Sequence, residues 1–230
     1  MSLDWIEEAK RRAAIEAAKN VKNNSIIGLG SGSTVTYVLE EIGRRIKEEN
    51  LWVLGVPTSH QSLLLAVRFG IPTTTLYEHP RIDLTIDGAD QIDPELNLIK
   101  GMGGALTREK IVASASRQLI IVADERKLTD KLGRNQLIPV EMIPIAEPLV
   151  VERIMEIGGK PRLREVKSNV PYITDNGNFI LDVDFGVIED PLELNRKLKM
   201  IPGVVETGLF INMAHSAYIG TKTTVKKISR

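Results

Sequence analysis

The stretch from residue 87 to 109, DGADQIDPELNLIKGMGGALTRE, gathers charged and flexible residues in one place. It contains three aspartates, one lysine, a Gly-Met-Gly-Gly run and a glutamate at the start of a predicted helix. A turn between two elements needs only about one glycine and one aspartate. The surplus indicates a site where carboxylates transfer protons, the lysine meets an anion and glycines let backbone N–H groups approach a ligand.

The aspartates follow an alternating strand predicted over 82–87. Ligands of open α/β sheets bind at the carboxyl ends of the strands, so Asp87 and Asp90 are interpreted as functional. Asp93 precedes a proline and is interpreted as a turn former. Lys100 stands at the edge of a backbone cradle formed by GMGGA, residues 101–105, where its ammonium group can meet an anion or oxyanion.

Glu109 follows that cradle in the first turn of a helix predicted over 106–115. Taken alone, the position favours a structural role, because an acidic side chain there complements the helix dipole. The alternative is a general base directed across the glycine cradle.

A second glycine loop, GLGSGST at 28–34, follows a strand predicted over 25–30 and opens a helix. Free N–H groups at a helix N-terminus attract an anion, and Ser33 and Thr34 add hydroxyl donors. A tight turn with Ser33 as the N-cap explains the loop about equally well. A dinucleotide fingerprint is disfavoured because Ser33 occupies the third glycine position and Gly55-Val56-Pro57 offers no acid. No Gly-Lys-Ser/Thr triplet occurs, so a mononucleotide or sugar phosphate is the preferred ligand.

Other classes of function receive little support from the sequence. His60, His79 and His215 lack metal-ligand spacing, so no metal site is predicted, and the absence of cysteine excludes thiolate chemistry. Thirty basic and thirty acidic residues give a formal net charge of zero, which argues against a broad nucleic-acid-binding surface. No apolar run reaches the length of a membrane span, and the N-terminus has no signal-peptide pattern. A soluble cytoplasmic protein is expected.

Strand and helix patterns alternate through the first half of the chain, which predicts a parallel sheet with helices on both faces. Near residue 133 the composition changes, because LGRNQLIPVEMIPIAEP has three prolines within ten residues. This pattern suits a domain boundary or an edge strand that tolerates proline. The following patterns read βαββαβ, with a strand pair expected at Asn176-Gly177, and the tail from 208 is expected to return to the first sheet. The predicted fold is α/β: a Rossmann-like open-sheet domain of residues 1–132 with 205–230, plus a smaller ferredoxin-like α+β domain of residues 133–204.

Together, GLGSGST, DGAD, KGMGGALTREK, ADERKL, LIPVEMIPIA and GLFINMAHSAYIG make the chain closely resemble the ribose-5-phosphate isomerases of the A type. The likeness covers nearly the whole length, with the motifs in the family's order and spacing. It implies a cofactor-free enzyme that interconverts ribose 5-phosphate and ribulose 5-phosphate. A homodimer or homotetramer is expected, since small enzymes of this kind commonly self-associate.

The resemblance also assigns roles to individual residues. It makes Glu109 the proton acceptor, and gives Lys127 and Lys10 contacts with the phosphate. It distributes the other substrate-binding residues over three loops: Ser31, Gly32, Ser33 and Thr34; Asp87, Gly88, Ala89 and Asp90; and Lys100, Gly101, Met102 and Gly103. Two departures occur, since Met102 replaces a usual glycine and His215-Ser216 replaces an acidic-apolar pair. The first puts the path of the third loop in question, and the second is expected to concern packing.

The implied chemistry is proton transfer from C2 to C1 through a cis-enediolate. Glu109 would take the C2 proton, Lys100 would stabilise the enediolate oxygen, and Asp87 and Asp90 would hold hydroxyls and assist ring opening. Two alternatives remain at this point. A sugar-phosphate sensor would have no need of Glu109 and would need an output segment, which the sequence does not provide. An acyl or CoA transferase would use Glu109 as a nucleophile.

Overall fold

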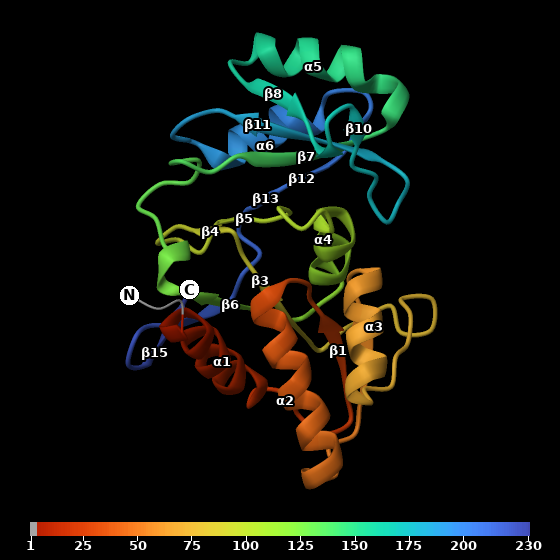
Figure 1. Cartoon of the computed structure of the whole chain (residues 1–230), viewed down its shortest axis with the longest axis vertical. Helices are drawn as coiled ribbons and strands as arrows, with labels where there is room; N and C mark the ends of the chain where they lie inside the picture. The colour runs from red at the N-terminus through yellow and green to blue at the C-terminus, as the bar shows by residue number, and fades with distance from the viewer. Residues whose placement is uncertain (1–3) are drawn as a thin grey trace. The chain divides into compact units, whose positions relative to one another are not determined.

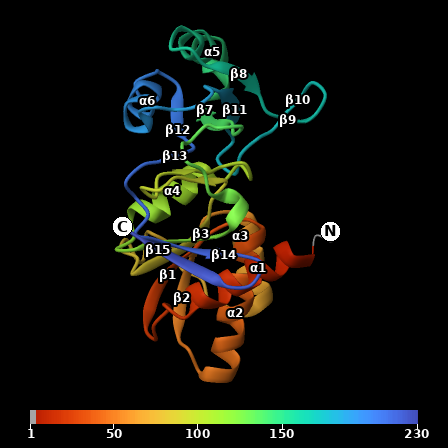
Figure 2. The ribbon, with the colours of Figure 1, turned by 90° about the vertical axis from the view of Figure 1, so that its left-hand side faces the viewer.

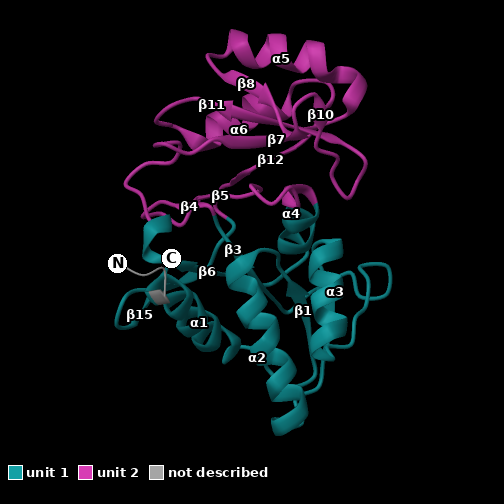
Figure 3. Cartoon of the chain, viewed as in Figure 1, with its two compact units in different colours: residues 1–89, 108–127, 213–230 teal, residues 90–107, 128–212 magenta. Residues whose placement is uncertain are grey.

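The computed structural model describes residues 4–230 and divides them into two compact units (Figure 3). Unit 1 contains the residues up to 89, 108–127 and 213–230, and unit 2 contains 90–107 and 128–212. Residues 1–3 of the first predicted domain lie outside the described residues. Within the described part of the chain, no helix is long and apolar enough to cross a membrane.

Unit 1 is built on a six-stranded sheet with the strand order β15-β14-β6-β3-β1-β2. Five strands run parallel and β15 pairs antiparallel with β14, at the edge of the sheet. The tail of the chain therefore returns to the first sheet, as predicted. The strands are β1 (Ser25–Leu29), β2 (Val53–Pro57), β3 (Leu84–Gly88), β6 (Leu119–Asp124), β14 (Ser216–Gly220) and β15 (Val225–Ser229).

Helices cover both faces of this sheet, because both faces of its strands are apolar. In β1, Ile27 and Leu29 join the core formed with the first helices of the chain, whereas Ile26 packs in a second cluster with Val112. Figure 1 shows the first three helices side by side, and Figure 2 shows them on the opposite side of the sheet from α4. These helices are α1 (Asp4–Ala18), α2 (Ser33–Glu49), α3 (His60–Phe69) and α4 (Leu106–Ser114).

Unit 2 contains a four-stranded antiparallel sheet in the order β12-β7-β11-β8. Two helices pack on one of its faces, where Val140 of β7 meets Val150 and Leu198 in the core. The chain order is βαββαβ, which confirms the predicted ferredoxin-like pattern. Its elements are β7 (Ile138–Met142), α5 (Glu147–Glu156), β8 (Lys160–Leu163), β11 (Phe179–Asp184), α6 (Pro191–Lys199) and β12 (Val204–Thr207).

The Asn-Gly turn was predicted to join a pair of strands, and this prediction was wrong. Gly177 has the expected positive φ of 79°, and β11 begins directly after the turn. However, both edges of β11 are occupied by β7 and β8, so the segment before the turn cannot pair with it and pairs with β9 instead. The two short strands concerned are β9 (Glu165–Lys167) and β10 (Val170–Pro171).

Residues 90–107 belong to unit 2, although the sequence-based division places them in the first domain. The reason is apolar packing, because Ile99 lies in the same buried cluster as Ile138 and Leu209. The domain division itself stays a prediction. Short elements complete the two units: β4 (Gln91–Ile92), β5 (Leu98–Ile99), β13 (Leu209–Phe210), and the 3₁₀ turns η1 (Glu125–Lys127) and η2 (Pro144–Ala146).

Candidate active site

Asp87 lies at the carboxyl end of β3 with its side chain fully buried, at 0% exposure. Its Oδ1 atom accepts the backbone N–H groups of Ser31 at 3.0 Å and Gly88 at 2.8 Å. A Cβ atom at residue 30 would lie 2.3 Å from the same oxygen, so only glycine lets the loop after β1 approach the carboxylate. The carboxylate of Asp87 therefore connects the second predicted loop to the first.

The Ser31 hydroxyl is held by the start of α3. Its Oγ atom lies 2.9 Å from Thr58 Oγ1 and 2.6 Å from Ser59 Oγ. Ser59 also caps α3 by accepting the N–H of Ser62 at 3.0 Å. Thr58 and Ser59 were not predicted as site residues, because only the parallel pairing of β2 with β1 brings them to Ser31.

The N-terminus of α2 is the helix end at which the sequence predicts an anion to bind. Gly32 is its N-cap, with φ 99° and no side-chain cap, and Ser33 is the first helical residue. The interpretation of Ser33 as the N-cap is therefore wrong, because the sharp turn requires a positive φ that only glycine adopts without strain. The first-turn N–H groups of a helix, here those of Ser33 and Thr34, have no partners within the helix.

Lys10 brings a positive charge to this helix end. Its ammonium nitrogen lies 3.2 Å from Ser33 Oγ and 2.8 Å from Glu7 Oε1. The hydrogen bond from Lys10, followed by that from Tyr37, lowers the pKa of Glu7 below its ordinary value. Lys10 therefore lies beside the first predicted loop, and its contact with the phosphate stays a prediction.

Lys127 lies in η1, directly after β6 reaches the carboxyl edge of the sheet. Asp124, the last residue of β6, is buried and bound by Arg126 through Nε–Oδ1 at 2.7 Å and Nη2–Oδ2 at 3.1 Å. Burial acts to raise the pKa of Asp124, but the hydrogen bonds and charge of Arg126, with the charge of Lys127, outweigh burial and lower it. Lys127 therefore adds positive potential at this sheet edge.

His215 lies away from this edge. Its Nδ1 atom accepts the N–H of Leu119 at 3.1 Å, where β6 begins. His215 therefore contacts the backbone at the start of β6, at the opposite end of the strand from the predicted site.

Unit 2 holds the remaining predicted residues, Asp90 and the loop from Lys100 to Gly103. Asp90 Oδ2 accepts the N–H of Met102 at 3.0 Å and so fixes the loop. Lys100 is 3% exposed, and its ammonium nitrogen lies 5.3 Å from the ring centroid of Phe210. This geometry suits a cation–π contact, which stabilises a buried ammonium group.

The third loop keeps its glycines at the positions where the backbone needs them. Gly101 and Gly104 have φ values of 102° and 82°, whereas Met102 does not have a positive φ. The Met102 side chain is 43% exposed, so a residue other than glycine fits here without strain. Arg164 supports the loop by donating from Nη1 to the carbonyl oxygens of Gly101 at 3.0 Å and Met102 at 3.1 Å.

Glu109 lies in the first turn of α4 and is only 5% exposed. In the same unit are Asp87, with Gly88 and Ala89 directly after it, the loop from Ser31 to Thr34, Lys10 and Lys127. Unit 1 thus supplies two buried carboxylates, an anion-attracting helix end and two lysines. Such a set can move a proton on an anionic substrate.

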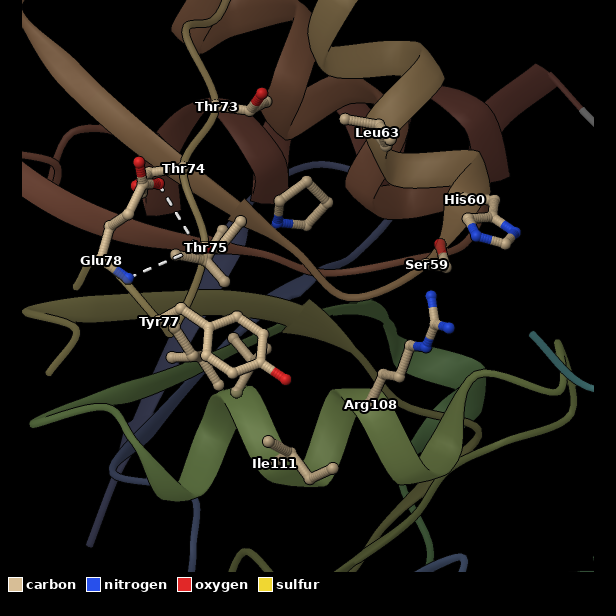
Figure 4. A pocket seen from close by; sticks show the side chains of 14 residues that line it. Ser59, His60, Leu63, Thr73, Thr74, Thr75, Tyr77, Glu78, Arg108 and Ile111 are labelled. Carbon is tan, nitrogen blue, oxygen red and sulfur yellow. Dashed lines mark hydrogen bonds between the residues drawn. The ribbon is translucent and has the colours of Figure 1, made fainter. Parts of the chain in front are cut away.

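A cavity of about 470 Å³ also lies in unit 1, between α3, α4 and the segment around Thr75. Figure 4 shows His60, Ser59 and Arg108 at one end and Glu78 at the other. His60 is exposed there, and the residues predicted for substrate do not line the cavity. Across residues 4–230, no group of three or more His, Cys, Asp or Glu side chains could hold a metal ion.

Comparison with known proteins places this geometry in context. Residues 54–224 match the family model described as Ribose 5-phosphate isomerase A (phosphoriboisomerase A). The ribose-5-phosphate isomerase A of Methanosarcina acetivorans is 54% identical over 220 residues, which cover 95% of this chain and 93% of the relative. That of Pyrococcus abyssi is 47% identical over 227 residues, covering 98% and 99%.

Solved structures give the same result. A D-ribose-5-phosphate isomerase in complex with phospho-erythronic acid superposes with a TM-score of 0.95 at 43% identity, covering 98% of this chain and 99% of the other. The ribose 5-phosphate isomerase A of Methanocaldococcus jannaschii superposes with a TM-score of 0.93 at 43% identity, with coverages of 97% and 99%.

Proposed function

Because the chain belongs to the ribose 5-phosphate isomerase A family and interconverts ribose 5-phosphate and ribulose 5-phosphate, we propose that Glu109 is its general base. The carboxylate would take the C2 proton of the open-chain aldose and return it to C1, through a cis-enediolate. The observation that carries this proposal is the burial of Glu109 in the first turn of α4. A buried carboxylate is shielded from water that would compete for the proton.

The phosphate would bind at the N-terminus of α2. Backbone N–H groups of Ser33 and Thr34 suit an anion, and the loop at Ser31 and Gly32 brings the chain close to it. Lys10 supports this role because its ammonium group already lies 3.2 Å from Ser33 Oγ. Lys127 would add a second positive charge. Holding the phosphate fixes C1 and C2 relative to the base, so remote binding energy orients the reacting carbons.

The other two loops would act on the sugar itself. Asp87 and Asp90 would accept hydrogen bonds from hydroxyl groups and assist ring opening by proton transfer, with Gly88 and Ala89 offering backbone contacts. The loop of Gly101, Met102 and Gly103 would present backbone groups to the substrate.

Lys100 would stabilise the negative oxygen of the enediolate. This charge develops mainly as the transition state is approached, so a fixed ammonium group favours that state over the substrate. Its burial at 3% exposure supports the role, because electrostatic attraction is stronger where water is excluded.

The test of this chemistry is the reaction of purified, EDTA-treated protein with ribose 5-phosphate in D₂O. Deuterium from the solvent at C1 of the ribulose 5-phosphate would demonstrate proton transfer, because a proton held on a carboxylate can exchange with the solvent whereas a hydride cannot. A product that keeps all of the substrate's C2 hydrogen fits a shielded base as well as a hydride, and turnover of Glu109→Gln then decides between them. Activity that requires an added divalent ion would contradict the cofactor-free mechanism. Phospho-erythronic acid is expected to inhibit competitively, since its planar carboxylate resembles the enediolate.

Assembly into a homodimer or homotetramer and a cytoplasmic location are also proposed. Small enzymes of this kind commonly self-associate, and light scattering of the purified protein measures the oligomeric state directly. Acyl-CoA turnover with covalent trapping of Glu109 would instead favour a transferase, for which the named relatives give no support.

A further inference from the structure

Glu141 is a fully buried carboxylate for which the proposed chemistry has no use. It lies in β7 at 0% exposure. The neighbouring residues Val140 and Met142 point into the apolar core with α5 and α6. Since side chains alternate along a strand, Glu141 faces the opposite side of the sheet. A buried charge on that side needs compensating hydrogen bonds.

Four side-chain donors supply this compensation. Oε1 accepts from Thr174 Oγ1 at 2.9 Å, Asn176 Nδ2 at 3.0 Å and Asn178 Nδ2 at 2.8 Å. Oε2 accepts from Thr107 Oγ1 at 2.5 Å. The carboxylate thus joins the turn before β11 to the first turn of α4. A neutral glutamine could not accept from both groups, because one end of its amide is itself a donor.

The bond to Thr107 has a consequence for the site. Thr107 is the second residue of α4 and Glu109 is the fourth, so one short helical turn carries both. The loop that leads into this turn is supported by the same part of unit 2, since Arg164 donates to Gly101 and Tyr172 Oη donates to the Gly103 carbonyl at 3.3 Å. Fixing Thr107 therefore fixes the beginning of the helix that carries the base.

We propose that Glu141 is a positioning residue that sets the orientation of Glu109 through Thr107, an inference that rests on the proposed role of Glu109. The carboxylate holds the first turn of α4 by the hydroxyl of Thr107, while its other oxygen is fixed by the turn at 174–178. Loss of this link leaves the phosphate site in unit 1 intact but lets the base depart from its productive geometry. Small displacements of a catalytic group lower turnover strongly.

The test compares Thr107→Val, which is nearly isosteric but lacks the hydroxyl, with Thr107→Ser, which keeps it. Thr107→Val is expected to lower kcat roughly 10- to 100-fold with little change in KM, and Thr107→Ser is expected to stay close to the wild type. Asn178→Ala is the matched control, because it removes a donor from the same carboxylate on the side away from α4. Its kcat is expected to remain near that of the wild type even where its thermal midpoint falls.

The proposal is wrong if Thr107→Val keeps wild-type kcat in the folded state, or if Asn178→Ala loses kcat to the same extent. Glu109→Gln separates this result from a failure of the proposed function. Wild-type kcat in Glu109→Gln would overturn the assignment of the base itself. Low kcat in Glu109→Gln beside normal kcat in Thr107→Val would overturn the positioning role alone. Glu141→Gln, studied in parallel, is expected to reproduce the kcat loss of Thr107→Val if the variant folds.

Discussion

Lys10 and Lys127 come from distant parts of the chain and contribute charge to the same unit, and their effects on binding should differ from that of a hydroxyl. Backbone N–H donors at the start of α2 survive truncation of Thr34, so Thr34→Ala should raise KM for ribose 5-phosphate only slightly. Lys127→Ala and Lys10→Ala would each remove a proposed charge-assisted contact with the phosphate, and such a contact is worth about 1.5–3 kcal/mol. Initial-rate kinetics should therefore show a larger increase in KM for either lysine variant.

Unphosphorylated ribose is the control for this comparison, since it has no phosphate for the lysines to hold. Its kcat/KM should be low in the wild type and nearly unaffected by Lys127→Ala. An equal loss for ribose and for ribose 5-phosphate would show that Lys127 does not contact the phosphate.

Single residues also mark how far the sequence could predict the site. Asp87, Glu109 and Lys100 could be singled out because charged residues beside glycine runs are unusual. Thr58 and Ser59 could not, because only the parallel register of β1 and β2 brings them to Ser31. The buried network of Glu141 likewise could not be predicted, because each of its four partners lies 33 or more positions from Glu141 in the sequence.

Among the secondary-structure elements, the turn from β1 into α2 is the one most tightly fitted to its neighbour. A Cβ atom at Gly30 would lie 2.3 Å from Asp87 Oδ1 and 2.6 Å from Asp87 Cα, so Gly30→Ala must displace the carboxylate or the backbone of β3. Overpacking of this kind costs about 1–3 kcal/mol of stability. Because Asp87 is proposed to hold the sugar, kcat should fall at least tenfold, measured under conditions in which the variant is folded.

Gly55→Ala is the matched control on the neighbouring strand β2. Its Cβ would lie 2.5 Å from Leu29 Cδ1, the end of a flexible apolar side chain, and it touches no carboxylate. A comparable loss of stability with little loss of kcat is expected. If both variants lose kcat equally, general strain in the sheet rather than displacement of Asp87 explains the effect.

The elements could be predicted well where hydrophobic periodicity and end signals agree, as in β1, β6 and α3, which ends at Gly70 with φ 74°. Pairing could be predicted less well. The Asn-Gly turn is local and correctly placed, but the partner of β11 is decided by strands that lie elsewhere in the sequence. Residues 90–107 were assigned to the first domain for the same reason, since their packing partners are distant in the chain.

For the whole molecule, stability towards acid should depend on Asp124 and Arg126. The pKa of Asp124 is lowered in the folded state, so its contribution to stability is present above its unfolded pKa of about 3.9 and is lost as pH falls through the lower folded value. Arg126→Ala should therefore reduce the free energy of unfolding at pH 7, and the difference from the wild type should shrink as pH approaches 3. Urea unfolding at several pH values measures this. A difference that is the same at pH 7 and pH 3 would exclude Asp124 as its source.

We infer that this isomerase moves a proton with Glu109, and the turnover of Glu109→Gln is the decisive measurement. Glutamine keeps the shape of the side chain but cannot accept the proton, and loss of a general base lowers kcat by roughly 10²–10⁴-fold. We expect that loss in a variant with wild-type circular dichroism and only a modest change in KM for ribose 5-phosphate. Near-normal kcat in the folded variant would contradict the assignment of Glu109.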